Sequence, residues 1–384
     1  MDSLERVKRT IEFGRPDRYP IMHAVLPAAW MRYGEKLYSI LRKYPTYLHR
    51  EAVEKTGGTG KWRPAAAGYE MSEELMERFV LEDDFVFVEP RTFQYGKPGR
   101  SGYQSDEWGC IWRKEDPGLV GQVVVHPLAK IVEEGLDDKA LEAYNFPDGS
   151  AYWRYDYPFL KAQEQFAYES RKYFLAYIGN LFELMQWLVG FENLMIAFHE
   201  RPTFVFKLID KIVEYSLETL REFAKYNIQG VSMNDDWGTQ RSLMIDPNMW
   251  RKYFKPAYKT IFQEAKERGL HVHFHTDGNT IEIIEDLIEI GVDVINPQLS
   301  AIDLERLSKI VKGRVCIRTD IDRQYILPQA SRTEVREYVK HVIELLGTKD
   351  GGLILCGEIN QDAKLENVEE MYRSFEEYGY LREE

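Results

Sequence analysis

Short hydrophobic stretches alternate with amphipathic stretches along the second half of the chain. Each short stretch is rich in apolar and β-branched residues, and each is followed by a segment with the apolar periodicity of a helix. The short stretches cover residues 230–236, 271–277, 292–298, 314–320 and 352–358. Repeated strand–helix units of this kind build a parallel sheet that is covered by helices.

The helical segments between these stretches have recognisable ends. Asp246 and Pro247 have the types expected of an N-cap and a first-turn proline. Ser331 and Glu334 have the spacing of a capping box before another apolar stripe. Gly291 ends the helix predicted after residues 271–277. These local signals agree with the alternation of strands and helices.

The first half of the chain adds three strand-like runs, so the total reaches eight. These runs cover residues 19–25, 84–89 and 173–179. Eight parallel strands with intervening helices are the number that closes a barrel. An open doubly wound sheet is the structural alternative, but no glycine-rich phosphate loop follows any of the strands. The sequence therefore predicts an α/β fold, a single (β/α)8 TIM barrel.

Two additions to the barrel are predicted. The charged N-terminal segment has helical spacing and forms a helical extension. Residues 96–125 have the pattern of an antiparallel ribbon, a β-hairpin insertion with turns around residues 116–118, and residues 127–172 are expected to be helical. We expect one domain over residues 1–384, with an inserted ribbon and helical segment at about 96–172.

Composition excludes several classes of protein. The chain has 384 residues, 44% of them hydrophobic, and a formal net charge of −13, which disfavours nucleic acid as a partner. The N-terminus has neither a signal peptide nor a transmembrane pattern, so no membrane association and a cytoplasmic location are expected. The cysteines are odd in number and far apart, as for reduced thiols. The three cysteines are Cys110, Cys316 and Cys356. No pattern in the sequence specifies an oligomeric state.

Polar residues gather at the predicted carboxyl ends of the strands, where barrel enzymes carry their active sites. We interpret six of them as candidate contacts for a small-molecule substrate: His23, Asn180, Asn234, Asn296, Gln298 and Arg318. Arg318 and Asp320 either anchor a substrate carboxylate or pair with each other, and the ion pair is favoured.

The stretch 271–277 contains the largest group of candidate catalytic or metal-binding side chains on one strand. Alternation places His271, His273, His275 and Asp277 on one face of the strand. Histidines inside a barrel must be hydrogen-bonded, charged against a carboxylate or bound to metal. They are either satisfied core residues or ligands, and we interpret them as two layers. His271 and His273 fill the barrel, whereas His275 and Asp277 face the substrate.

Further candidates lie on two other strands. Asp235 and Asp236 are adjacent and so face opposite ways, and Asp236 shares its parity with Asn234. Asp236 is therefore a candidate general base or substrate contact, and a turn or N-cap role is the alternative. Cys356 and Glu358 share a parity, and either completes a metal site with His275 and Asp277.

Several segments resemble the uroporphyrinogen-decarboxylase-like superfamily, over most of the chain. They include ERVKRTIEFGRPDRYPI at 5–21, HFHTDGN at 273–279, GVDVINPQ at 291–298, TDIDRQYILP at 319–328 and GGLILCGEINQDAKLENV at 351–368. GNLFELMQWLVGFENL at 179–194 and DDWGTQ at 235–240 look like the branch related to corrinoid-dependent methyltransferases. The resemblance implies a single (β/α)8 barrel. It also implies a zinc site, in which Asp277 stands where those methyltransferases keep a cysteine.

The leading hypothesis is metal-assisted methyl transfer from a small O-methyl or related substrate to a corrinoid carried by a partner protein. Zinc or another divalent metal is held by His275, Asp277 and Glu358 or Cys356, with His273 a further candidate ligand. Asp236 and His275 are the catalytic candidates. The alternative is a decarboxylase that acts without metal, with Asp236 or His275 as proton donor. A third possibility is a non-catalytic binding protein.

Overall fold

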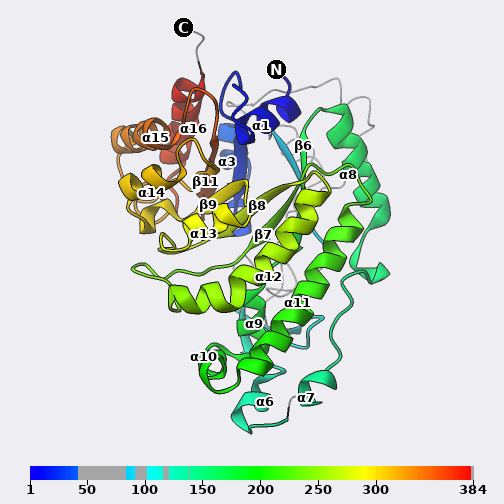
Figure 1. Ribbon diagram of the computed structural model, residues 1–384. Helices are drawn as coiled ribbons and strands as arrows, with labels where there is room; N and C mark the ends of the chain where they lie inside the picture. Colours follow the sequence, from blue (N-terminus) through cyan, green and yellow to red (C-terminus); the bar gives the residue numbers. More distant parts are fainter. Residues whose placement is uncertain (42–83, 91–101, 116–120, 138, 382–384) are drawn as a thin grey trace.

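Parallel strands form one continuous sheet that curls into a barrel (Figure 1). The computed structural model describes residues 1–41, 84–90, 102–115, 121–137 and 139–381, so the turns predicted around residues 116–118 lie outside the described residues. Within these ranges the sheet has eight strands in the order β1-β11-β10-β9-β8-β7-β6-β2. They are β1 (Ile21–Val25), β2 (Phe85–Val88), β6 (Tyr173–Gly179), β7 (Gly230–Asn234), β8 (His271–Thr276), β9 (Val294–Pro297), β10 (Cys316–Arg318) and β11 (Leu353–Ile359).

Asp84 joins the two ends of the sheet. Its peptide N–H donates to the Ile21 carbonyl at 3.4 Å, and its carboxylate accepts from the Ile21 N–H at 2.9 Å. Arg6 and Arg18 each donate to the same carboxylate at 3.2 Å. This cluster lies at the amino ends of the strands, where α1 (Ser3–Ile11) packs. The predicted TIM barrel and N-terminal helical extension are confirmed.

Helices follow the strands and cover the outside of the barrel (Figure 1). The predicted capping box of Ser331 and Glu334 is present at the start of α15, and Asp246 caps α12 with Pro247 in its first turn. The helices around the barrel are α2 (Pro27–Tyr33), α3 (Glu35–Leu41), α9 (Phe182–Val189), α10 (Phe191–Glu200), α11 (Pro202–Phe223), α12 (Pro247–Glu267), α13 (Ile284–Glu289), α14 (Leu304–Val311), α15 (Arg332–Leu346) and α16 (Leu365–Gly379).

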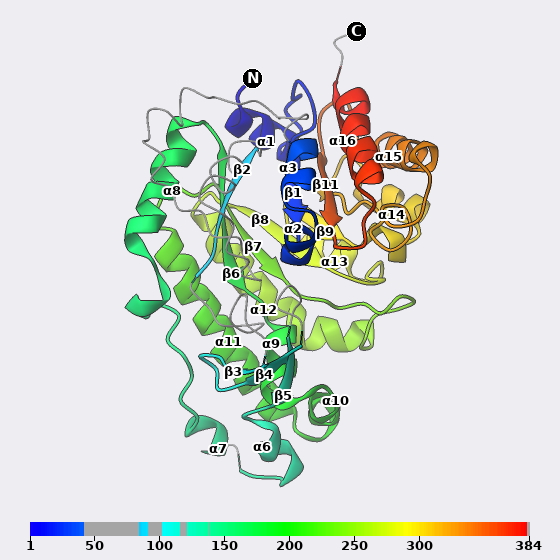
Figure 2. The same ribbon diagram turned by 180° about the vertical axis from the view of Figure 1, so that it is seen from behind.

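The insertion between β2 and β6 contains a small antiparallel sheet. Its described strands are three rather than the two of the predicted hairpin, because β5 pairs with the free side of β4. Figure 2 shows this sheet with α6 and α7 at the end of the molecule opposite α1, near α9 and α10. The inserted elements are β3 (Gly102–Ser105), β4 (Ile111–Lys114), β5 (Gln122–Val125), α6 (Ala129–Glu133), α7 (Lys139–Glu142), the 3-10 turn Tyr152–Arg154 and α8 (Tyr157–Glu169).

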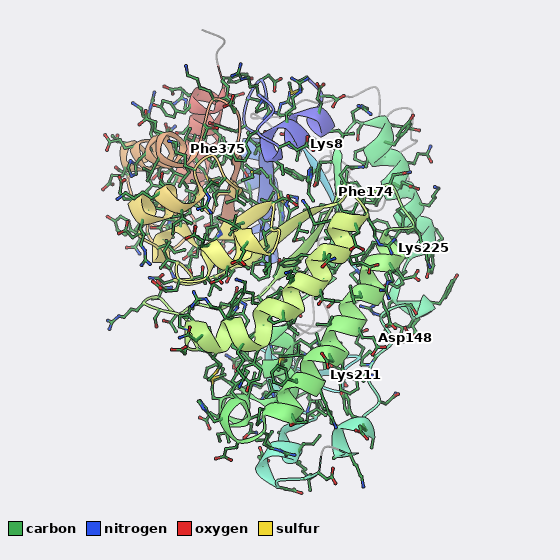
Figure 3. All side chains as sticks on the ribbon, viewed as in Figure 1. Lys8, Asp148, Phe174, Lys211, Lys225 and Phe375 are labelled. Atoms are coloured by element: carbon green, nitrogen blue, oxygen red, sulfur yellow. The ribbon has the colours of Figure 1, made fainter. Side chains whose placement is uncertain are left out.

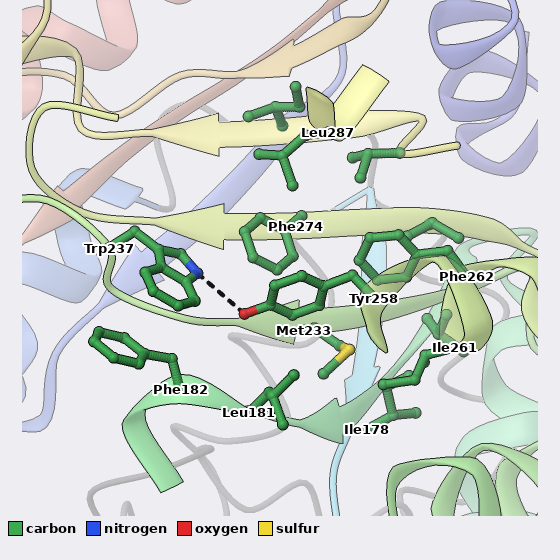
Figure 4. Close-up of a cluster of buried hydrophobic side chains, with 14 of the residues drawn as sticks. Ile178, Leu181, Phe182, Met233, Trp237, Tyr258, Ile261, Phe262, Phe274 and Leu287 are labelled. Atoms are coloured by element: carbon green, nitrogen blue, oxygen red, sulfur yellow. Dashed lines mark hydrogen bonds between the residues drawn. The ribbon is translucent and has the colours of Figure 1, made fainter. Parts of the chain in front are cut away.

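The main core lies between the outer face of the sheet and the helices. Figure 4 shows Phe274 of β8 against Tyr258 and Phe262 of α12, with Trp237 donating to the Tyr258 hydroxyl at 3.0 Å. Charged side chains such as that of Lys211 stand on the outer surface (Figure 3). The alternation predicted for β8 is therefore confirmed, since its apolar residues meet the helices. None of the helices in the described ranges has both the length and the hydropathy required to cross a bilayer.

Candidate metal and substrate site

Three side chains converge at the mouth of the barrel, where β7 and β8 end. The Nε2 atom of His275 lies 3.7 Å from Oδ1 of Asp236 and 3.6 Å from Oδ1 of Asp277. The peptide N–H of Asp277 donates to Oδ1 of Asp236 at 3.0 Å and so fixes the two aspartates relative to each other. Neighbouring parallel strands bring these residues together, because Asn234 pairs in register with His275.

Asn296 sets the tautomer of His275. Its amide nitrogen donates to the carbonyls of Arg318 and Thr319 at 2.9 and 3.3 Å, so its Oδ1 is the atom that faces His275. That oxygen lies 2.7 Å from Nδ1 of His275. Because an amide oxygen can only accept, Nδ1 carries the proton. Nε2, the nitrogen left to bind a metal, is the ring atom that lies near the two aspartates.

The geometry of these three residues fits a divalent metal ion. One ligand atom from each of Asp236, His275 and Asp277 lies within 4.8 Å of the others. The measured separations of 3.6 and 3.7 Å from Nε2 are close to the roughly 3.3 Å between ligand atoms around tetrahedral zinc. Oδ1 of Asp277 is buried without a hydrogen-bond partner in the described structure. An orphaned carboxylate oxygen beside an imidazole lone pair is suited to binding a cation.

Arg323, which the sequence analysis did not single out, binds the carboxylates on the other side of this cluster. Its guanidinium donates to Oδ2 of Asp277 and lies 3.4 Å from Asp320 and 3.1 Å from Glu358. Asp320 is thus paired with Arg323, whereas Arg318 donates to Asn296, so the favoured Arg318–Asp320 pair was wrong. Arg323 lies three residues after Asp320, a spacing that could have suggested the pair.

Burial changes the protonation of the carboxyl groups around the site. It raises the pKa of Asp320 to about 7, although Arg323 opposes this shift. Burial also raises the pKa of Glu358 and that of Asp236. Glu183, in the first turn of α9, was missed from the sequence, and burial together with the charge of Asp236 holds its pKa well above the usual value. The site therefore contains several carboxyl groups whose pKa values lie above their usual range.

Asp235 has a structural role, unlike its neighbour Asp236. It is fully buried, and its carboxylate accepts from the peptide N–H groups of Leu181 and Glu183 at 2.7 and 2.9 Å. The hydroxyl of Tyr258 also donates to it, at 2.6 Å. Asp235 thus anchors the start of α9, and Asp236 alone of this pair belongs to the cluster with His275.

Several candidate substrate contacts lie around the cluster. The side-chain nitrogen of Asn180 donates to Glu183 at 3.3 Å, and its buried Oδ1 has no hydrogen-bond partner in the described structure. Asn180 lines a small cavity together with Tyr177. Asn234 ends β7 beside His275. Gln298 accepts from the Gly278 N–H at 2.8 Å and so supports the loop after β8.

Other candidates lie farther from the three ligand atoms. His273 is buried one layer below His275, and its Nε2 lies 3.2 Å from the hydroxyl of Tyr173. His23 is buried on β1, with its Nδ1 2.7 Å from the hydroxyl of Tyr372. Cys356 is buried, and its peptide N–H donates to the hydroxyl of Thr319 at 2.8 Å. The converging group contains none of His273, Cys356 and Glu358, the last being ion-paired with Arg323.

The structure thus defines a parallel α/β barrel with a histidine–carboxylate site at its mouth. The chain belongs to the uroporphyrinogen decarboxylase (URO-D) family, whose pattern matches residues 162–378, more than half of its length. The family resemblance found in the sequence is therefore confirmed. A search of curated protein sequences finds no significant match.

A solved structure supports the fold, and two others show a weaker similarity. A methyltransferase from Methanosarcina mazei is similar with a TM-score of 0.65 and 14% identity, over 98% of this chain and 99% of that one. An endo-beta-1,4-xylanase from Gloeophyllum trabeum has a TM-score of 0.37 and 9% identity, over 65% and 92% of the two chains. A D-psicose 3-epimerase from Clostridium cellulolyticum H10 has a TM-score of 0.34 and 10% identity, over 64% and 92%. At such identities the likeness to the methyltransferase concerns the barrel fold alone.

Proposed function

We propose that this chain is a metal-dependent methyltransferase. It transfers a methyl group from a small O-methyl or related substrate to a corrinoid carried by a partner protein. The observation that carries the proposal is Nε2 of His275, which lies near two carboxylates while Asn296 holds the other ring nitrogen. The methyltransferase from Methanosarcina mazei, whose fold extends over the whole chain, is compatible with this assignment.

Asp236, His275 and Asp277 would hold the metal, in place of the set with Glu358 or Cys356 expected from the sequence. Zinc or another divalent ion bound there would act as a Lewis acid on the heteroatom of the substrate. Two oxygen ligands and one nitrogen make a harder site than thiolates do, which favours an oxygen substrate. Three protein ligands leave a coordination position open, as a catalytic site requires.

The chain's own residues would then position the substrate and supply a proton. In the reaction the bond between the substrate oxygen and its methyl carbon breaks, the methyl group passes to the corrinoid, and the oxygen takes up one proton. Glu183 is a candidate donor of that proton, because it lies in the first turn of α9 beside the site and burial raises its pKa. Asn180 donates to Glu183 and would orient its carboxyl group.

A decarboxylase acting on a compound with many carboxylates is the alternative that the family match brings into consideration. Such a substrate needs a surplus of cationic side chains at the mouth of the barrel. Among the described residues of the site the cations are Arg318 and Arg323, and Arg323 already contacts three carboxylates. The local charge therefore favours a neutral or cationic substrate and the methyl-transfer proposal.

The proposal is tested by measuring metal content together with activity. Purified protein loaded with zinc should retain about one ion per chain, and H275A should lose it. The matched control H341A, which changes an exposed histidine of α15, should retain it. Reduced cobalamin and a panel of methyl ethers serve as the activity probe. A wild-type protein that binds no transition metal, or that releases CO2 from a polycarboxylate without metal, would refute the proposal.

A further inference from the structure

Arg323 connects three strand ends through one guanidinium group. It lies in the segment between β10 and α15, and it contacts Asp277 after β8, Asp320 after β10 and Glu358 on β11. Its side chain is only 15% exposed. A guanidinium is planar and permanently charged, and it can bind carboxylates along two edges at once. Arg323 therefore fixes the relative positions of these three acids.

The two carboxylate oxygens of Asp277 make different contacts. Oδ2 accepts from Arg323, whereas Oδ1 faces Nε2 of His275 and has no hydrogen-bond partner in the described structure. Arg323 thus orients Asp277 so that one oxygen only is presented to the candidate metal position. This arrangement favours a ligand that binds through a single oxygen atom.

Glu358 is the nearby carboxylate that Arg323 keeps apart from the cluster. Its Oε1 lies 3.1 Å from Nη1 of Arg323, while Nη2 of the same guanidinium binds Asp277. Glu358 and Asp277 thus bind the two terminal nitrogens of one guanidinium group. A divalent cation at the cluster would attract a neighbouring carboxylate strongly, because the site is partly removed from water. Without Arg323, Glu358 is placed to become a fourth protein ligand.

We propose that Arg323 is a positioning residue that holds Glu358 away from the metal and so keeps one coordination position free for substrate. The proposal rests on the proposed function, because it requires a metal at Asp236, His275 and Asp277. Its physical basis is the difference between zinc sites with three protein ligands, which are open to substrate, and sites with four, which are closed. Arg323 would therefore determine that the site is catalytic rather than structural.

The test measures zinc affinity by competition with a chromophoric chelator, and counts protein ligands by X-ray absorption spectroscopy. R323M should bind zinc at least about tenfold more tightly than wild type, gain a fourth protein ligand and lose methyl-transfer activity. The double variant R323M/E358Q should return to three ligands and lose most of the gain in affinity. R314M, which removes an exposed arginine paired with Glu285, is the matched control and should bind zinc as wild type does.

The outcomes separate this proposal from the one on which it rests. If wild type binds no zinc, the proposed function fails and Arg323 has no such role. If wild type binds zinc but R323M binds it equally or more weakly, only the role of Arg323 is refuted. A double variant that keeps the whole gain would also refute it, because loss of charge repulsion would then explain the gain. Should R323M not fold, E358Q alone decides, since its zinc affinity must equal that of wild type.

Discussion

Two groups of buried charges lie at opposite ends of the same barrel, and they are composed in opposite ways. At the amino ends of the strands, two arginines surround one buried aspartate, and Arg6 also binds the partly exposed Asp17. Asp84 accepts from Arg6, Arg18, Ser3 and the peptide of Ile21, so both of its oxygens are used. At the carboxyl ends, one arginine faces a surplus of acids. Arg323 is surrounded by Asp277, Asp320 and Glu358.

The difference separates a structural ion cluster from a functional one. A buried carboxylate with all its oxygens paired is best explained by stability, and the amino end of a barrel is where stabilising contacts gather. At the carboxyl ends of the strands, Oδ1 of Asp277 is buried without a hydrogen-bond partner in the described structure. Burial there also raises the pKa of Glu358. Unpaired acids and raised pKa values are typical of sites that await a cation or a substrate.

The largest effect that this comparison predicts is on stability at the amino end. D84N removes the negative charge that lies against Arg6 and Arg18, at the position that joins β1 to β2. Removing this buried counter-charge should lower the free energy of unfolding by about 3 kcal/mol, although Arg6 keeps its pair with Asp17. Urea denaturation of the metal-free protein measures it.

The control for this prediction is D350N, which breaks the exposed pair of Arg15 and Asp350. It should change the free energy of unfolding by less than about 0.5 kcal/mol. If D84N were as mild as D350N, the cluster at the amino end would not be a stabilising one.

Much of the barrel could be predicted because its strands and caps are local patterns. The alternation in β8 separated Phe274, which packs on α12, from His275, which faces the mouth. Parity also separated Asp236 from Asp235, although the sequence could not say that Asp235 would anchor α9. Such assignments need only the two-residue period of a strand.

The partners of each charge could not be predicted, since they depend on which loops meet over the barrel. Asp320 pairs with Arg323 of its own loop, not with Arg318. Glu183 reaches the site only because α9 begins beside β7. Sequence spacing contains no information about the approach of segments that are more than one hundred residues apart, as Asp236 and Glu358 are. The sequence could therefore name candidate residues. It could not say which of them are metal ligands and which only position the ligands.

A smaller effect is expected at the carboxyl end from Asn296, which holds His275 through its amide oxygen. N296A removes the acceptor for Nδ1, so the ring can rotate and take the other tautomer. Zinc affinity should fall about 10–100-fold, the usual result of losing such a supporting contact. N296D keeps an acceptor for Nδ1 but sets its second oxygen against the carbonyls of Arg318 and Thr319, so it should recover only part of the affinity. Equal loss in both variants would show that Asn296 does not act through the tautomer.

The smallest predicted effect is a change in the free energy of unfolding that depends on pH. It arises from Asp320, one of the excess acids at the carboxyl ends of the strands. Burial raises the pKa of Asp320 to about 7 from a usual value of 3.8, so the folded protein binds more protons than the unfolded chain between these two pH values. Stability from this group therefore falls as pH rises from about 4 to 7, and stays low above that. D320N removes the ionisation and should be more stable than wild type by on the order of 1 kcal/mol at pH 8, with no gain at pH 4.

This prediction tests whether the two ends of the barrel really differ, because an acid replaced at the amino end should destabilise at both pH values. Urea denaturation of D320N and D84N, with EDTA present so that no metal contributes, makes the comparison directly. The charged groups that act on Asp320 are Arg323, Glu358, Asp277 and His275. Since Arg323 keeps two other carboxylate partners in D320N, its charge remains compensated. If D320N were less stable than wild type at pH 8, the charge of Arg323 would require all three carboxylates for its compensation. The carboxyl ends of the strands would then carry no excess of buried acids.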